Sequence, residues 1–181
     1  MYRSVGRTVT ILSQGSLWGV DILILVCVGA SEYPFDRLLS AVDDLCDKGV
    51  ICDEVIAQVG SSKYCARNFK CFDLVSREDF QDYLKATDLV ITHAGTGSVV
   101  PPLKLGKKVI VFPRREKYKE HLDDHQLELA DVFSKRGYVL QATSEDELKN
   151  VLQHINEFKP EPFVSNNSYM NKLVIGFIES L

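Results

Sequence analysis

Two segments of the chain carry residues whose types and spacing could bind a phosphorylated sugar. In the first, residues 91–98 (ITHAGTGS), an apolar run enters a glycine-rich turn ahead of a helical pattern. Such a turn presents backbone N–H groups and the positive end of a helix dipole, and both favour an anion. The second, residues 120–126 (EHLDDHQ), collects acidic and neutral hydrogen-bonding side chains. The first segment suits a diphosphate, and the second suits the hydroxyl groups of a sugar.

The glycine-rich turn also has a simpler interpretation. Glycine accepts positive φ in any tight turn between a strand and a helix, with or without a ligand. Ser98 can likewise be only the N-cap of the following helix. His93 and Ser98 favour anion binding, because both side chains can donate to phosphate oxygens beside the backbone.

The second segment has a metal site as its alternative. His121 and His125 are four residues apart, so on a helix they would face the same side and, with a neighbouring carboxylate, could resemble a metal site. No third ligand cluster and no HExxH motif accompanies them. We therefore expect no metal, and we expect Asp124, His125 and Gln126 to bind sugar hydroxyls.

Seven cations occur within sixteen residues of an otherwise acidic chain. Three of them are expected to form a solvated rim, and the other four follow a strand end, where they could meet a diphosphate or an anionic membrane surface. The rim residues are Lys104, Lys107 and Lys108, and the strand-end residues are Arg114, Arg115, Lys117 and Lys119.

Composition indicates one globular domain. The chain has 181 residues, of which 45% are hydrophobic and 25% charged, enough for a core of its own. The net charge of −4 argues against nucleic acid as a partner. The five cysteines have irregular spacing without a CxxC pair, which favours reduced thiols over a disulfide framework. Cys27 and Cys71 fall on expected strands and are expected to be small core residues.

The two ends of the chain are expected to lie outside the main domain. Residues 1–20 are interpreted as an N-terminal extension; the apolar run that follows is interrupted by Asp21 and is too short to span a bilayer, so it predicts a buried first strand. The main, Rossmann-like domain is expected over residues 21–158. A proline-containing connector then leads, within residues 159–181, to an amphipathic helix, which either packs on the chain's own sheet or docks a partner.

Between these ends, short apolar runs alternate with helical patterns. The order β-α-β-β-α-β-α-β-α-β-α predicts an α/β, Rossmann-like, doubly wound parallel sheet, whose ligands bind at the carboxyl ends of the strands. Residues 35–46 have helical spacing and end at Gly49; helices are also expected after Ser76, up to Gly137 and after the capping box at Ser144. The expected strands are Ile22–Val28, Glu54–Val59, Phe69–Phe72, Leu89–Thr92, Val109–Phe112 and Tyr138–Leu140.

Four segments in this order and spacing resemble one family: VGASEYPFDRLL, ITHAGTGS, LGKKVIVFPRR and EHLDDHQ. They are similar to the soluble donor-binding subunit of two-part UDP-sugar transferases. That group includes the PssE-type bacterial exopolysaccharide proteins and the eukaryotic subunit that adds the second N-acetylglucosamine to dolichol-diphosphate. The resemblance, to the C-terminal half of a GT-B glycosyltransferase of family 28, covers roughly Leu23 to Leu181.

The resemblance, taken with the two segments, implies a divided donor site. The residues expected at the diphosphate are Gly29, Ser31, His93, Gly95, Thr96, Gly97, Ser98 and Arg114, and those expected at the donor sugar are His121, Asp124, His125 and Gln126. One position departs from the family: many relatives have a ribose-binding glutamate where this chain has Pro101, followed by Pro102. We expect the prolines to be tolerated because first-turn N–H groups need no partner, and ribose recognition to use another group or be weaker.

The resemblance also implies a reaction and a missing half. The reaction would be inverting transfer of a sugar from a UDP-sugar to a lipid-diphosphate-linked acceptor, without a metal or cofactor. A membrane-associated subunit would bind the acceptor and supply the catalytic base, so this chain would be cytoplasmic and peripheral at the cytosolic face of the membrane. Two alternatives stay open: a non-catalytic sugar-nucleotide-binding module, and a stand-alone sugar-nucleotide epimerase or hydrolase.

Overall fold

The computed structural model describes residues 22–164. The expected extension over residues 1–20 and the amphipathic part of the expected C-terminal element lie outside the described residues. Within the described range, none of the helices has the length and apolar character needed to cross a membrane.

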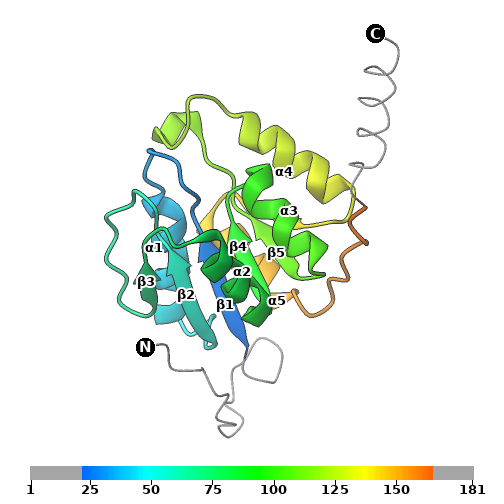
Figure 1. The fold of residues 1–181 in the computed structure, drawn as a ribbon, viewed down its shortest axis with the longest axis horizontal. Helices are drawn as coiled ribbons and strands as arrows, with labels where there is room; N and C mark the ends of the chain where they lie inside the picture. Colours follow the sequence, from blue (N-terminus) through cyan, green and yellow to red (C-terminus); the bar gives the residue numbers. More distant parts are fainter. Residues whose placement is uncertain (1–21, 165–181) are drawn as a thin grey trace, which may run out of the picture.

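A single sheet organises the described chain (Figure 1). Its order is β3-β2-β1-β4-β5-β6, and every neighbouring pair is parallel. This is the strand order of a doubly wound dinucleotide-binding sheet, so the predicted fold class is confirmed. The strands are β1 (Leu23–Cys27), β2 (Glu54–Gln58), β3 (Lys70–Phe72), β4 (Leu89–Thr92), β5 (Lys108–Val111) and β6 (Leu140–Gln141).

Helices cover both faces of the sheet. Alternate side chains of β1 enter different layers: Ile24 and Val26 pack with the apolar faces of α1 and α5, whereas Leu25 packs with α2, α3 and α4. The period of two along each strand therefore divides one sheet into two cores. The helices are α1 (Asp36–Asp47), α2 (Arg77–Ala86), α3 (Thr96–Lys104), α4 (His125–Lys135) and α5 (Glu145–Gln153), and Glu116–Tyr118 forms a short 3-10 helix, η1.

The predicted helix boundaries have the expected local chemistry. Gly49 and Gly137 adopt φ of 65° and 70°, and their N–H groups bond back to Cys46 and Ser134. At the other ends, the hydroxyls of Ser76 and Ser144 accept hydrogen bonds from backbone N–H groups three residues later. These contacts satisfy backbone groups that a helix end leaves without partners.

Strand limits differ from the apolar runs by one or two residues. The sixth strand was predicted at Tyr138–Leu140 but pairs at Leu140–Gln141, because the N–H of Tyr138 bonds to the carbonyl of Phe133 and closes α4. Val139 is buried without belonging to the strand. The prediction that Cys71 is a core residue was wrong: it lies exposed on β3, the edge strand.

The two prolines lie deeper in α3 than expected. The helix begins at Thr96, so Pro101 and Pro102 occupy its second turn rather than its first. A proline there has no N–H to donate to the carbonyl four residues earlier. The explanation from free first-turn N–H groups was therefore wrong, and the carbonyls of Gly97 and Ser98 lack their usual helical donors.

Candidate functional site

The glycine-rich turn lies at the carboxyl end of β4, as predicted. Gly95 is the N-cap of α3, with φ of −68° and ψ of 134°, and no side chain caps this helix. Ser98 is therefore not the N-cap; its hydroxyl lies 2.9 Å from Nε2 of His93. The first-turn N–H groups of Thr96 and Gly97 have no acceptor within the helix and can bind an anion.

His93 is held as a neutral imidazole of defined tautomer. Its Nδ1 accepts a hydrogen bond of 3.0 Å from the N–H of Gly95, so the ring proton must be on Nε2, facing the Ser98 hydroxyl. Burial, reinforced by the charge of Arg114, lowers the pKa of His93 from 6.5 to about 4. His93 therefore contributes no positive charge at neutral pH. By donating to the Ser98 oxygen, it leaves the Ser98 hydroxyl proton available for a ligand.

Two glycines enclose the His93 ring. A Cβ at Gly29 would lie 2.5 Å from Nε2, and one at Gly95 would lie 2.3 Å from Cε1. Gly29 also has φ of 79°, a conformation that side chains rarely adopt. The loop after β1 and the turn after β4 are thus fitted around a single imidazole.

Gln58 fixes the loop after β1, a role that we did not predict from the sequence. Its Oε1 accepts from the N–H of Gly29 at 3.1 Å, and its Nε2 donates to the Gly29 carbonyl at 3.2 Å. The Cys27 thiol lies 3.2 Å from the same Oε1. A buried glutamine ending the otherwise apolar β2 was the available signal, since a buried polar side chain needs partners.

Gln126 joins the ends of β4 and β5. Its Oε1 accepts from the N–H of Ala94 at 3.3 Å and from the N–H of Arg114 at 3.2 Å. The side chain is buried at the start of α4. The residue expected at the donor sugar thus lies beside the glycine-rich turn and also supports its shape.

Arg114 is placed differently from the other residues of the expected diphosphate set. Its side chain is only 1% exposed. The guanidinium donates to the carbonyls of Val28, Tyr33 and Glu120 at 2.7, 2.8 and 3.0 Å. It therefore connects the loop after β1 to the loop after β5. A direct contact between the guanidinium and a phosphate would require these hydrogen bonds to open.

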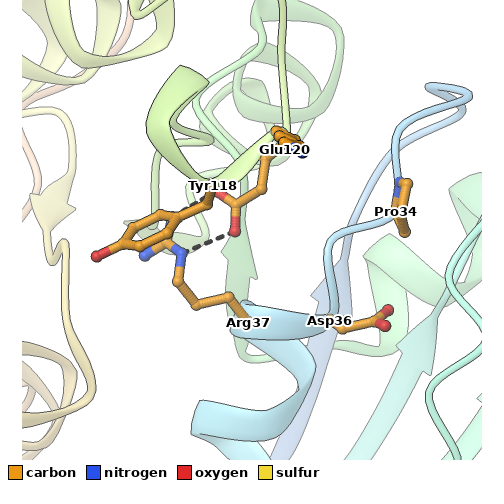
Figure 2. Close-up of a pocket in the computed structure, with 6 residues that line it drawn as sticks. Pro34, Asp36, Arg37, Tyr118 and Glu120 are labelled. Carbon is orange, nitrogen blue, oxygen red and sulfur yellow. Dashed lines mark hydrogen bonds and ion pairs between the residues drawn. The ribbon is translucent and has the colours of Figure 1, made fainter.

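A second arginine, Arg37 of α1, also binds the loop after β5. The Nε and Nη2 atoms of Arg37 each lie 2.8 Å from the Glu120 carboxylate (Figure 2). Nη2 also donates to the Pro113 carbonyl. The Glu120 carboxylate additionally accepts from the N–H of Arg115. The Tyr118 ring lies against the Arg37 guanidinium, 4.9 Å away.

These side chains border a pocket of about 330 Å³ (Figure 2). It contains none of the residues expected to bind the donor, so we do not place the donor there. Its lining includes Lys119, which adopts φ of 58°, the one positive value of a non-glycine residue in the described range. The lining residues are Pro34, Asp36, Arg37, Tyr118, Lys119 and Glu120.

The remaining expected sugar ligands form local contacts. Asp124 accepts from the N–H of Glu116, which, with the neighbouring Arg115, lowers its pKa. His121 pairs with Asp123 at 2.9 Å, and His125 lies 3.6 Å from Glu128. Because α4 begins at His125, the two histidines do not share a helix face.

Ser31 forms contacts within the loop after β1 and with the segment after β2. Its hydroxyl accepts from the N–H of Tyr33, and its carbonyl accepts from the Ser61 hydroxyl. In the part of the chain that the structure describes, no group of three or more histidine, cysteine or acidic side chains is arranged to hold a metal ion.

Comparison with known proteins gives this arrangement a family. The glycosyltransferase family 28 C-terminal domain matches residues 23–173. The chain is 38% identical over 96 residues to the UDP-N-acetylglucosamine transferase subunit ALG13 of Saccharomyces cerevisiae, covering 52% of this chain and 46% of that protein. It is 41% identical over 70 residues to the Cryptococcus neoformans protein of the same name, covering 38% and 33%.

A solved structure agrees with these matches. The NMR solution structure of ALG13 superposes with a TM-score of 0.56 at 26% identity, covering 84% of this chain and 94% of that one. The matched segments span less than half the length of the two curated relatives. Because the family match covers most of the sequence and the sheet has the expected order, the chain belongs to the glycosyltransferase family 28 C-terminal domain family.

Proposed function

We propose that this chain is the donor-binding subunit of a UDP-sugar glycosyltransferase that acts together with a membrane-associated partner. The observation that carries the proposal is the glycine-rich turn itself. It combines first-turn N–H groups of α3, a Ser98 hydroxyl with its proton available, and the close approach of the Gly29 loop. These features suit a diphosphate at the carboxyl end of a doubly wound sheet.

The donor proposed for the first assays is UDP-N-acetylglucosamine. This choice rests on the name of the ALG13 relatives, which are UDP-N-acetylglucosamine transferase subunits. Gln126, His121, Asp124 and His125 are the proposed sugar contacts, on the loop that follows β5 and the start of α4. With Pro101 in place of a glutamate, backbone groups are the proposed ribose contacts.

The proposed reaction is an inverting displacement. The acceptor hydroxyl oxygen attacks C1 of the sugar from the face opposite the diphosphate, the bond between C1 and the phosphate oxygen breaks, and its electron pair leaves with UDP. The N–H groups at the start of α3 and the Ser98 hydroxyl would stabilise the negative charge that develops on the leaving diphosphate. The acceptor proton passes to a base that we assign to the partner subunit.

The partner is proposed to bind the lipid-diphosphate-linked acceptor at the cytosolic face of the membrane. The expected helix within residues 159–181 is its proposed docking element. Deleting residues 164–181 is expected to abolish co-purification with the partner, while circular dichroism of the truncated chain stays that of a folded domain. A complex that survives the deletion would exclude this docking element.

The donor site is tested by calorimetry on the isolated chain with UDP and UDP-N-acetylglucosamine. Replacing Ser98 by alanine removes a hydroxyl donor, and His93→Ala removes the group that orients it, so both variants are expected to bind UDP at least about fivefold more weakly. Gln126→Ala is expected to weaken the UDP-sugar more than UDP. Unchanged affinities in all three variants would remove the site assignment.

Turnover is tested with the complex. The chain is co-expressed with the membrane-associated subunit, and membranes are assayed with a panel of UDP-sugars. Transfer that needs both subunits is the expected result. Turnover by the isolated chain would instead indicate a stand-alone enzyme, and UDP binding without transfer in the complex would indicate a non-catalytic module.

A further inference from the structure

Arg114 is a buried cation that forms no ion pair with an acidic side chain of the described residues. Three charged residues are buried in the described range: Asp43, Arg114 and Glu120. Asp43 is paired with Arg67, and Glu120 is paired with Arg37. The Arg114 guanidinium instead contacts backbone carbonyls and the ring of Phe35, 4.5 Å away, and its Nε is a buried atom with no hydrogen-bond partner.

Such an arrangement is costly in the absence of a ligand. Removing a charge from water disfavours the charged form, and carbonyl dipoles replace only part of the lost hydration. Burial accordingly lowers the pKa of Arg114 to about 10, which leaves the group protonated at neutral pH. A neutral side chain with N–H donors could bind the same carbonyls without the free-energy cost of burying a charge.

The location of the charge suggests what it serves. Arg114 contacts both loops that border the glycine-rich turn, through Val28 and Tyr33 on one side and Glu120 on the other. Its charge also reaches the groups beneath the turn, since it acts to lower the pKa values of His93 and Cys27, although burial raises that of Cys27 overall. With His93 neutral, Arg114 is the buried positive charge nearest the turn among the described residues.

We propose that Arg114 is the buried counter-charge for the donor diphosphate. Its charge acts on the diphosphate through the loops after β1 and β5, without direct contact. The inference rests on the proposed donor site and deepens it. Arg114 is in this sense a positioning residue: it fixes the two loops and makes the glycine-rich turn favour an anion before the donor arrives. The Glu120 carboxylate acts on Arg114 through its charge but is bound to Arg37, so the diphosphate is the further anion that would balance Arg114.

The test separates charge from loop support by comparing UDP with uridine, which lacks the diphosphate. Both are titrated by NMR at about pH 6.5 into the wild-type chain, Arg114→Met and Arg114→Lys. A unit charge acting over about 10 Å at an effective dielectric constant of about 20 changes an equilibrium roughly tenfold. The UDP-to-uridine affinity ratio should therefore fall about tenfold in Arg114→Met. It should stay within about threefold of the wild type in Arg114→Lys, whose ammonium remains protonated at this pH.

Lys104→Met is the matched control. It removes an exposed cation from the last turn of α3, where solvent screens the charge, so the ratio should not change. The counter-charge role is wrong, and Arg114 only supports the loops, if Arg114→Met weakens the binding of UDP and of uridine equally. It is also wrong if the UDP-to-uridine affinity ratio falls as far in Arg114→Lys as in Arg114→Met. Should Arg114→Met not fold, Arg114→Gln, which removes the charge but keeps a donor for the loop carbonyls, takes its place with the same expected fall in the ratio. A wild-type chain that binds neither ligand would overturn the proposed donor site itself, and the inference with it.

Discussion

Acidification should destabilise this domain through one histidine. The folded chain holds His93 neutral with a pKa near 4, whereas an unfolded chain would protonate it near 6.5. Between these values the unfolded state binds a proton that the folded state does not, so stability falls with falling pH. The contribution is fully present above about pH 6.5 and is lost as the pH approaches 4.

The size of the effect follows from the shift. A change from 6.5 to about 4 corresponds to about 3 kcal/mol when it is complete. Between about pH 7.5 and about pH 5 the expected loss is about 2 kcal/mol. The Asp43 carboxylate does not interfere, since hydrogen bonds from Arg67, Asn68 and Tyr64 outweigh its burial and hold its pKa at about 2, below this window.

Urea unfolding at the two pH values measures this loss. Wild type should lose about 2 kcal/mol of unfolding free energy, and His93→Gln, which cannot be protonated, should lose almost none. His154→Gln, at an exposed position after α5, is the matched control and should behave as wild type. A two-dimensional NMR titration of the imidazoles reports the same pKa directly and shows whether the proton is on Nε2.

Two results would refute the reasoning. If the wild-type chain loses less than about 0.5 kcal/mol, the imidazole is not held neutral by burial. If His93→Gln loses as much as the wild-type chain, another group is responsible for the acid sensitivity. Either outcome would also remove the argument that His93 leaves the Ser98 proton available for a ligand.

Three further substitutions test the supports of the site. Glu120→Ala leaves Arg37 without its carboxylate and should cost about 3 kcal/mol of unfolding free energy, measured in urea. Asp43, on α1, accepts hydrogen bonds from the backbone N–H groups of Arg67 and Asn68 in the loop before β3. Asp43→Ala removes this acceptor, so native-state hydrogen exchange in that loop should become faster. Gly60→Ala should lower the unfolding free energy by more than about 1 kcal/mol, because Gly60 has φ of 52° and an added Cβ would lie 2.4 Å from the Gly29 carbonyl.

These substitutions have their own controls. Lys48→Ala breaks an exposed ion pair with Glu145 and should leave stability unchanged, in contrast to Glu120→Ala. Gly97→Ala places a Cβ in open space and should be tolerated in the fold, in contrast to Gly60→Ala. If a substitution and its control change the unfolding free energy equally, then burial of the ion pair or close approach of the added Cβ does not determine the loss of stability.

The order of elements and the helix ends could be predicted because local chemistry determines them. Gly49 and Ser144 act within a few residues of their helices, so sequence spacing alone locates them. The glycine-rich turn was also predictable, since β4 and α3 flank it directly. What failed locally was the interpretation of the double proline, where the true start of α3 at Thr96 moved Pro101 into the second turn.

The contacts of Arg114 and Gln58 could not be predicted in this way. Arg114 reaches Val28 across 86 positions of sequence, and Gln58 reaches Gly29 across 29. Their partners are backbone groups, which have no residue type to recognise. An arginine after a strand is also a common phosphate ligand, and only the tertiary structure shows that the Arg114 guanidinium donates to loop carbonyls.

The two glycines around His93 impose different limits on sequence change. At Gly95 the backbone φ is an ordinary −68°, so glycine is needed there only because an imidazole occupies the space a side chain would fill. At Gly29 the φ of 79° demands glycine whatever stands at position 93. A smaller residue at 93 would therefore relieve a substitution at 95 but not one at 29. Positions 93 and 95 should covary during divergence, while position 29 stays glycine.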